Sequence, residues 1–184
     1  MISTHQTISI PLSKGKMLIS LILALGFVGL SIYFLSAKDY FLHIINSPVL
    51  ISIVGIAGII FFGFSAIIII RKLLVPKEGL IINSQGITDN SSGVSAGFIP
   101  WDIIVEIKEV SVMNQKFVSI QLNNPEKFIA SQQNNFIKKV MTVNHEKFGS
   151  AVSISANNLK TNHVQLLDLL QSHLKQYNQI TQNN

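Results

Sequence analysis

Two long apolar runs dominate the first part of the 184-residue chain. Residues 17–37 and 49–70 contain no Asp, Glu, Lys or Arg. At about 1.5 Å of rise per helical residue, each run reaches roughly 30 Å, the thickness of the hydrocarbon core of a bilayer. The pattern therefore predicts a transmembrane hairpin over residues 17–70, made of two helices that a small outward turn connects.

Two other interpretations of these runs are a cleaved signal peptide for the first and a buried helix of a soluble protein for the second. The apolar core of a signal peptide usually has about 7–15 residues, which is shorter than residues 17–37. A second apolar run also follows almost at once. We therefore expect two membrane spans.

The residues after the hairpin, 77–178, begin with strand spacing. Residues 80–82 are apolar, residues 98–107 are rich in strand-forming residues, and residues 116–122 have a period-two pattern, while clusters of Asn, Asp, Ser and Gly lie at 83–86 and 89–93. Such clusters form turns because their residues tolerate tight backbone conformations. Short strands joined by polar turns predict an antiparallel meander.

The apolar period becomes helical after Pro125. Proline suits the first turn of a helix, and Asn124 suits the N-cap before it. Apolar residues recur at helical spacing up to about Gly149, but the stretch 131–135 is entirely polar. This helical insert, about 125–148, is therefore either one broken helix or two. Residues 151–155 then return to strand spacing.

A closing amphipathic helix is predicted at the end of the domain. Asn162 and Gln165 have the spacing of a capping box, in which each side chain binds the other residue's backbone N–H. The apolar stripe would pack on the core, and it comprises Val164, Leu166, Leu167, Leu169, Leu170, Leu174 and Tyr177. The polar residues 179–184 are expected to form a disordered tail.

The segment before the first span, residues 1–16, carries a short strand pattern of its own. Ile8, Ile10 and Leu12 alternate with polar or proline positions. Because Pro11 has no backbone N–H to donate, it is tolerated only at the edge of a sheet. We expect Ile8 to Leu12 to pair with a sheet edge of the later domain; a flexible tail is the alternative.

Four stretches, "IPLSKGK", "GLIINSQGITDNSSG", "IPWDII" and "SISANNL", carry a resemblance over nearly the whole chain. Because of these four stretches, the chain resembles small bacterial inner-membrane proteins that place a transmembrane hairpin ahead of a cytoplasmic pleckstrin-homology-like (PH-like) domain. The resemblance implies an α+β fold, in which a bent antiparallel sheet surrounds one core and a C-terminal helix plugs an open end. A complete domain of this kind has seven strands, whereas the pattern after the hairpin indicates five or six.

Trp101, the single tryptophan of the chain, lies between Pro100 and Asp102. Pro100 interrupts a strand ladder and Asp102 suits a tight turn, so these three residues predict a structural corner where the sheet bends. Trp101 would then pack on Leu167 or Leu170 of the closing helix. A membrane anchor is a weak alternative, since the second span ends some thirty residues earlier. A ligand platform would need aromatic or basic neighbours besides Phe98.

The charged residues are few and favour one orientation. They form 12% of the chain, with a net charge of +5, against roughly 25% in ordinary globular domains. Basic residues flank the outer ends of the two runs, and short basic flanks stay in the cytoplasm; they are Lys14, Lys16, Arg71, Lys72 and Lys77. We expect both termini to be cytoplasmic and these side chains to contact anionic lipid. Scattered lysines and one arginine predict no nucleic-acid partner.

Catalytic signatures are missing from the sequence. His163 and His173 are ten residues apart, which is not the spacing of a zinc-binding helix motif, and no nucleophile elbow or phosphate-binding loop is present. The absence of cysteine removes thiol chemistry and cysteine metal sites. We therefore expect no enzyme, no metal site and no cofactor.

The function expected from these patterns is a non-catalytic binding or scaffolding module, anchored at the cytoplasmic face of the bacterial inner membrane. Its partners would be the lipid bilayer and a protein at the membrane, or further copies of the chain. An accessory subunit of a membrane transport complex is the alternative. Recognition of a specific lipid headgroup is disfavoured, because the loop 89–96 holds no basic residue.

Overall fold

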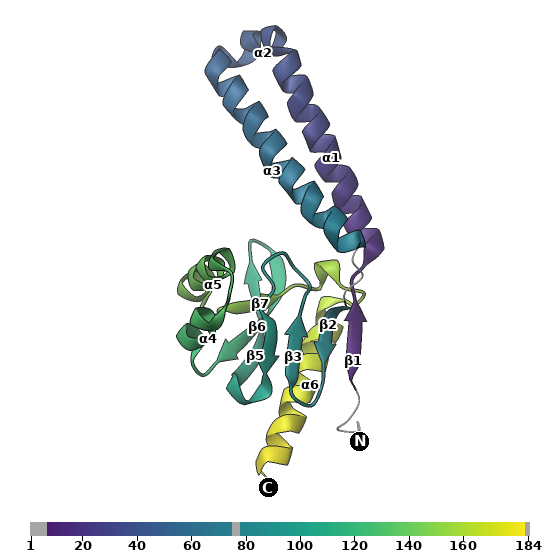
Figure 1. The fold of residues 1–184 in the computed structure, drawn as a ribbon, viewed down its shortest axis with the longest axis vertical. Helices are drawn as coiled ribbons and strands as arrows, with labels where there is room; N and C mark the ends of the chain where they lie inside the picture. The colour runs from purple at the N-terminus through teal and green to yellow at the C-terminus, as the bar shows by residue number, and fades with distance from the viewer. Residues whose placement is uncertain (1–6, 75–77, 183–184) are drawn as a thin grey trace. The chain divides into compact units, whose positions relative to one another are not determined.

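The computed structural model describes residues 7–74 and 78–182, and the protein belongs to the α+β class. Two long apolar helices come first, followed by antiparallel sheets and a C-terminal helix (Figure 1). The chain divides into two compact units. The hairpin unit covers residues 14–76, and the sheet unit combines residues 1–13 with residues 77–184.

The hairpin unit contains α1 (Lys14–Ser36), α2 (Lys38–Ile45) and α3 (Pro48–Leu74). Both long helices lie where the apolar runs predicted spans, and both are long and apolar enough to cross a membrane. The expectation of a small turn between them was wrong, because the connection forms the short helix α2. Asn46 ends α2 in a left-handed conformation, with φ of 39°. The Ser47 hydroxyl then accepts the Leu50 N–H at the start of α3.

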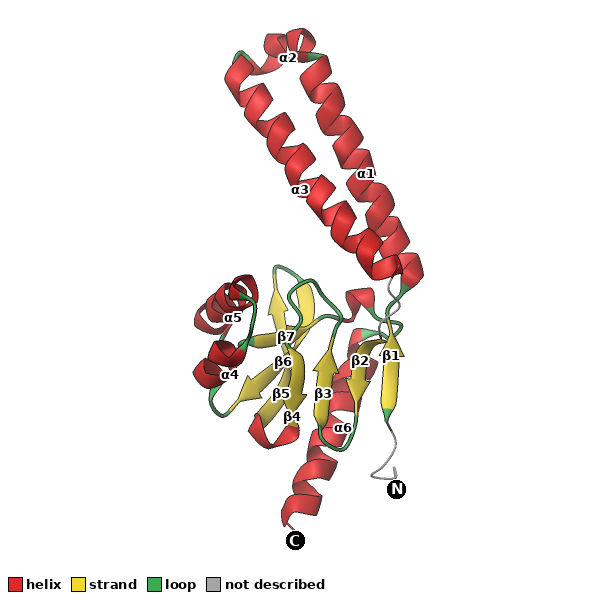
Figure 2. Cartoon of the chain, viewed as in Figure 1, coloured by secondary structure: helices red, strands yellow, loops and turns green. Residues whose placement is uncertain are grey.

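Helices α1 and α3 lie side by side in the hairpin unit (Figure 2), and small residues and a pair of stacked rings occur where they meet. Phe27 of α1 stacks on Phe62 of α3 at a centroid distance of 4.6 Å. A side chain at Gly55 would collide with Leu35, and one at Gly58 would collide with Ser31. Most apolar side chains of the two helices point outward and are exposed. Little of the surface of either helix is therefore buried within this chain.

Among the described residues of the sheet unit, seven antiparallel strands form two sheets. The first sheet has the order β1 (Ile8–Pro11), β2 (Glu78–Ile82), β3 (Gly86–Asp89) and β4 (Gly97–Pro100). The second has the order β5 (Ile104–Val112), β6 (Gln115–Leu122) and β7 (Val152–Ile154). The meander is thus confirmed as antiparallel.

The strand expected before the hairpin is present as β1, at the edge of the first sheet. Ile8 lies opposite Ile82, and Ile10 lies opposite Leu80 on β2. The register shifts at Pro11, whose carbonyl accepts the Lys160 N–H, and Leu12 forms an isolated bridge with Leu159. The hairpin is therefore inserted, in sequence, between two neighbouring strands of one sheet.

The helical insert consists of two helices, α4 (Pro125–Ser131) and α5 (Asn135–Phe148), which settles the alternative that the sequence left open. The Asn124 side chain caps α4 as predicted, and Asn134 caps α5. Gly149 ends α5 at a φ of 72°, a conformation that favours glycine. The insert connects β6 to β7.

The closing helix α6 (His163–Gln182) begins with the predicted capping box. The Gln165 N–H donates to the Asn162 side chain at 2.9 Å, and the Asn162 N–H donates back to Gln165 at 3.5 Å. Leu166, Leu170 and Leu174 are its buried side chains. Val164 was wrongly placed in the apolar stripe, since it is 71% exposed.

The end of α6 also differs from the expectation. Residues 179–182, predicted to belong to a disordered tail, continue the helix to Gln182; Asn183 and Asn184 lie outside the described residues. Aliphatic side chains from both sheets and α6 make up the core of the sheet unit, and the fully buried ones include Leu80, Ile82, Ile87, Ile99, Ile120, Ile154, Leu159, Leu166 and Leu170.

Candidate functional site

The predicted corner lies where the chain passes from the first sheet to the second. Pro100 ends β4, and Trp101–Ile103 form one turn of 3-10 helix before β5 begins at Ile104. The Trp101 backbone N–H donates to the carbonyl of Gln85 at 3.1 Å. The carboxylate of Asp102 is exposed and makes no hydrogen bond with any described residue. Asp102 therefore lies in the turn, but its side chain does not cap it.

Trp101 is 2% exposed, and its ring is fully engaged by neighbours. The indole N–H donates to the Asn83 carbonyl at 2.8 Å, and the ring stacks on Tyr177 of α6 at a centroid distance of 6.3 Å. Tyr177 lies later on α6 than Leu167 and Leu170, the residues that were expected to pack on Trp101. Because the ring has little free surface, Trp101 does not form a ligand platform.

The predicted basic residues lie where the chain enters the hairpin unit and where it leaves it. Lys14 and Lys16 are on the first turn of α1, and Arg71 and Lys72 are on the last turn of α3. Since α1 and α3 run antiparallel as neighbours, these four side chains belong to the same end of the hairpin. Lys77 lies outside the described residues.

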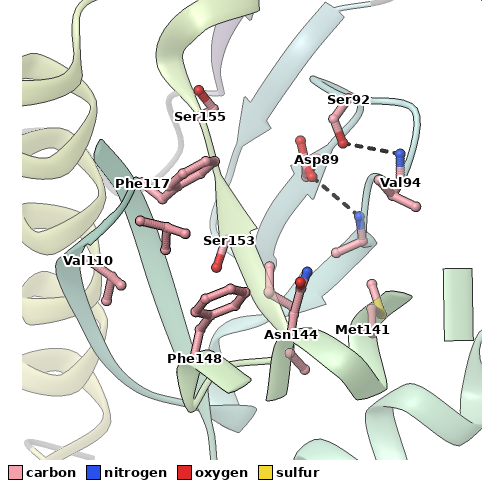
Figure 3. Close-up of a pocket in the computed structure, with 14 residues that line it drawn as sticks. Asp89, Ser92, Val94, Val110, Phe117, Met141, Asn144, Phe148, Ser153 and Ser155 are labelled. Carbon is pink, nitrogen blue, oxygen red and sulfur yellow. Dashed lines mark hydrogen bonds between the residues drawn. The ribbon is translucent and has the colours of Figure 1, made fainter. Parts of the chain in front are cut away.

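A pocket of about 230 Å³ in the sheet unit is a candidate binding site (Figure 3). Four parts of the chain line it: the end of β3 with the loop after it, the β5–β6 hairpin, helix α5, and β7 with its flanks. Most of the lining is apolar, including Val94, Val110, Val112, Phe117, Met141 and Phe148. The polar part of the lining consists of the side chains of Asp89, Ser92, Asn144, Ser153 and Ser155.

The β3–β4 loop forms one wall of this pocket, and Asp89 holds its shape. One carboxylate oxygen of Asp89 accepts the Ser91 N–H at 2.8 Å, and the other accepts the Ala96 N–H at 3.3 Å. The Ser92 hydroxyl accepts the Val94 N–H at 3.2 Å, as Figure 3 also shows. Asp89 is only 3% exposed, so its charge is satisfied by backbone donors rather than displayed to a ligand.

The opposite side of the pocket is formed by β7 and α5. Ser153 is exposed on β7, and its side chain lies in the pocket with those of Asn144 and Phe148 from α5 (Figure 3). The buried Ser150 hydroxyl donates to the carbonyls of Ile120 and Val152, which fixes the start of β7 against β6. This side of the pocket is therefore formed by a hydrogen-bonded strand.

The sequence analysis missed this pocket, and no motif signals it. Its lining residues are scattered from 89 to 155, and they come together only when α5 and the β3–β4 loop approach the second sheet. The sequence offers one signal of the pocket: the loop 89–96 has the apolar residues Val94 and Ala96 near its end. Apolar residues there indicate that this part of the loop packs on other residues.

An ionic cluster joins β5 to the start of α6. Glu109 accepts hydrogen bonds from Lys116 at 3.0 Å and from His163 at 2.7 Å. Lys116 first, and then His163, lower the pKa of the Glu109 carboxyl below its ordinary value. Farther along α6, the Gln171 amide donates to the Ile107 carbonyl at 2.8 Å. These contacts tether α6 to the second sheet.

Side chains that could hold a metal ion are not brought together in the part of the chain that the structure describes. No cluster of three or more His, Asp or Glu side chains suited to a metal ion occurs there. The pocket's chemistry is instead that of an apolar cavity with a few hydroxyl and amide groups on its rim.

Comparisons with protein-family models, with curated proteins and with solved structures find no match for this chain.

Proposed function

We propose that this protein is a non-catalytic binding or scaffolding module, anchored in the bacterial inner membrane by the hairpin unit and exposing the sheet unit to the cytoplasm. The observation that carries the proposal is the pairing of β1 with β2. These strands precede and follow the hairpin in sequence. Because they share one sheet, the two ends of the hairpin have to emerge on the same side of the membrane.

The exposed apolar surfaces of α1 and α3 support a lipid environment for the hairpin. Each helix has the length and composition of a span, and little of its apolar surface is covered by protein. Short basic flanks favour the cytoplasmic side, and Lys14, Lys16, Arg71 and Lys72 are such flanks. Both termini would then be cytoplasmic, and these side chains would contact anionic headgroups.

The sheet unit is proposed to be a PH-like domain that the hairpin interrupts between its first and second strands. Seven antiparallel strands in sheets of four and three, followed by a closing helix, support this identity. The missing strand of the expected domain would be β1. The α4–α5 insert, which fills the β6–β7 connection, would be an addition to the domain.

The mechanism that we propose is localisation. Confining a binding domain to the membrane surface raises its effective concentration toward a partner held at the same surface. The pocket beside β7 supplies a surface for such a partner, while its rim holds no group of residues suited to catalysis.

The membrane orientation is tested with single cysteines, since the chain has none of its own. We would place one at Asn46, between α2 and α3, and one at Asn178, on α6. In spheroplasts carrying the full chain, a membrane-impermeant maleimide should label Asn46→Cys directly and Asn178→Cys only after lysis. Labelling of both positions, or the reverse pattern, would contradict the proposal.

Partner binding is tested by crosslinking the full chain in membranes and purifying it. Recovery of a defined protein partner or of homo-oligomers supports a binding module. Recovery of one stoichiometric transport complex would favour the alternative, an accessory transport subunit.

A further inference from the structure

The four terminal strands of the two sheets differ in how well they are protected from pairing with another chain. Proteins protect sheet edges with proline, charge and irregular backbone. β1 carries Pro11, and β4 carries Pro100 together with Gly97 at a φ of 69°. β5 carries the charged residues Glu106, Lys108 and Glu109.

β7 has none of these protecting features. Its sequence is Val152, Ser153 and Ile154, and β6 pairs with it along one side. No strand pairs with its other side in the described ranges, 7–74 and 78–182. Its short length gives some protection, and α5 and the β3–β4 loop lie beside it around the pocket. Ser153 is nevertheless exposed, and β7 is the terminal strand whose own sequence opposes pairing least.

The candidate pocket lies along this strand. Ala151, Val152, Ser153 and Ser155 line it from β7 and its flanks. Side chains of a strand alternate in direction, so a segment added beside β7 would direct every second side chain toward the pocket. The volume, about 230 Å³, exceeds the roughly 150 Å³ that accommodates a benzene ring. One large aliphatic or aromatic side chain fits this space.

The charges of the lining decide what kind of occupant the pocket suits. It contains no Lys, Arg or His, and its single ionisable group is Asp89. The Asp89 carboxylate already accepts the backbone N–H groups of Ser91 and Ala96. An anionic headgroup would find no counter-charge and would lie close to this carboxylate. The occupant is therefore uncharged where it enters the pocket.

We propose that the free edge of β7 and the adjoining pocket bind an extended, uncharged peptide segment of a partner protein. Main-chain hydrogen bonds to β7 give the affinity, and one large apolar side chain in the pocket gives the specificity. The inference rests on the proposed binding function and names the surface and the partner chemistry that this function would use.

The test uses the full chain in lipid nanodiscs and a phage library of random heptapeptides. In the Ser153→Trp variant, an indole from an exposed position of β7 fills the pocket without replacing a core side chain. Ser111→Trp is the matched control, since Ser111 is an exposed serine of β5 that does not line the pocket. Peptides that bind the wild-type chain should be uncharged, with apolar residues at alternating positions.

Selected peptides should bind Ser153→Trp at least tenfold more weakly and Ser111→Trp equally well. Their binding should slow amide hydrogen exchange at residues 152–155. The inference is overturned if no enriched peptide depends on Ser153, if protection appears at β1, β4 or β5, or if enriched peptides are charged. It is also overturned if nanodisc lipid, and no peptide, is crosslinked in the pocket.

Crosslinking in membranes separates this inference from the proposed function. If the Ser153→Trp chain still recovers the wild-type partner, the binding function stands and the β7 site is wrong. If neither chain recovers a partner or a homo-oligomer, the proposed function itself fails.

Discussion

The indole N–H of Trp101 donates a hydrogen bond of 2.8 Å to the backbone carbonyl of Asn83. Asn83 also organises the turn between β2 and β3, where its side chain accepts the backbone N–H groups of Gln85 and Gly86. One residue thus connects the turn of the first sheet to the corner that leads into the second. Tyr177 of α6 completes the arrangement by stacking on the indole.

Replacing Trp101 with alanine should destabilise the sheet unit by about 3–5 kcal/mol, because a large buried ring is lost. Trp101→Phe should cost less but still leave the Asn83 carbonyl without its donor, at about 1–3 kcal/mol. Chemical denaturation of the full chain in detergent, followed by far-UV circular dichroism, measures both. Met113→Ala is the control, since Met113 is 97% exposed. Equal stability of Trp101→Ala and wild type would contradict the structural role.

Removing the Ile10 side chain tests whether the segment before the hairpin belongs to the sheet. Ile10 is buried opposite Leu80 of β2, so Ile10→Ala should lower the unfolding free energy by about 2–5 kcal/mol. Limited proteolysis of the full chain should then cut the sheet unit faster. Ser9→Ala, at the neighbouring position of β1, should leave the cutting rate near that of wild type. An Ile10→Ala chain as resistant as wild type would argue for a flexible tail.

Gly86 of β3 lies opposite Pro100 of β4, with the β4 backbone close to its Cα. A Cβ at this position would collide with the carbonyl of Ile99 and with Pro100, both backbone atoms that cannot rotate away. Gly86→Ala should therefore shift the strands and cost about 1–3 kcal/mol. Gly93→Ala is a matched control, because a Cβ at Gly93 meets open space. Thermal melting of both variants should show a lower midpoint for Gly86→Ala alone.

The Glu109 cluster predicts a pH dependence for the attachment of α6. Lys116 and His163 lower the pKa of Glu109 in the folded state, so the unfolded chain binds the proton more readily and folding is favoured as the pH rises. This stabilisation is fully present above the ordinary glutamate pKa of about 4.3. It is lost as the pH falls below that value through the lowered pKa.

Glu109→Gln removes this contribution. The difference in melting temperature between the wild-type chain and the variant should be positive near pH 6 and shrink toward zero below about pH 4. Glu146→Gln offers a control, because Glu146 is exposed on α5 and is not part of the cluster that Glu109, Lys116 and His163 form. A difference that stays constant across this range would show that the carboxylate does not hold α6.

The sequence by itself determined the features that depend on neighbouring residues. Apolar runs set the places of α1 and α3, since a span is read from local composition alone. Capping residues located helix starts, because Asn124 and Asn162 bond to backbone groups only three residues away. The period-two pattern located β1, β6 and β7 for the same reason, while the shortness of the connection between the spans concealed α2.

Contacts between distant segments were decided only by the tertiary structure. Trp101 selects Asn83 and Tyr177 because the corner brings a turn and a helix together, and no local pattern specifies that meeting. The pocket beside β7 arises in the same way, from side chains as far apart as Asp89 and Ser155. Local periodicity fixes which face of each element is apolar; only packing decides which apolar faces meet and where they leave a space.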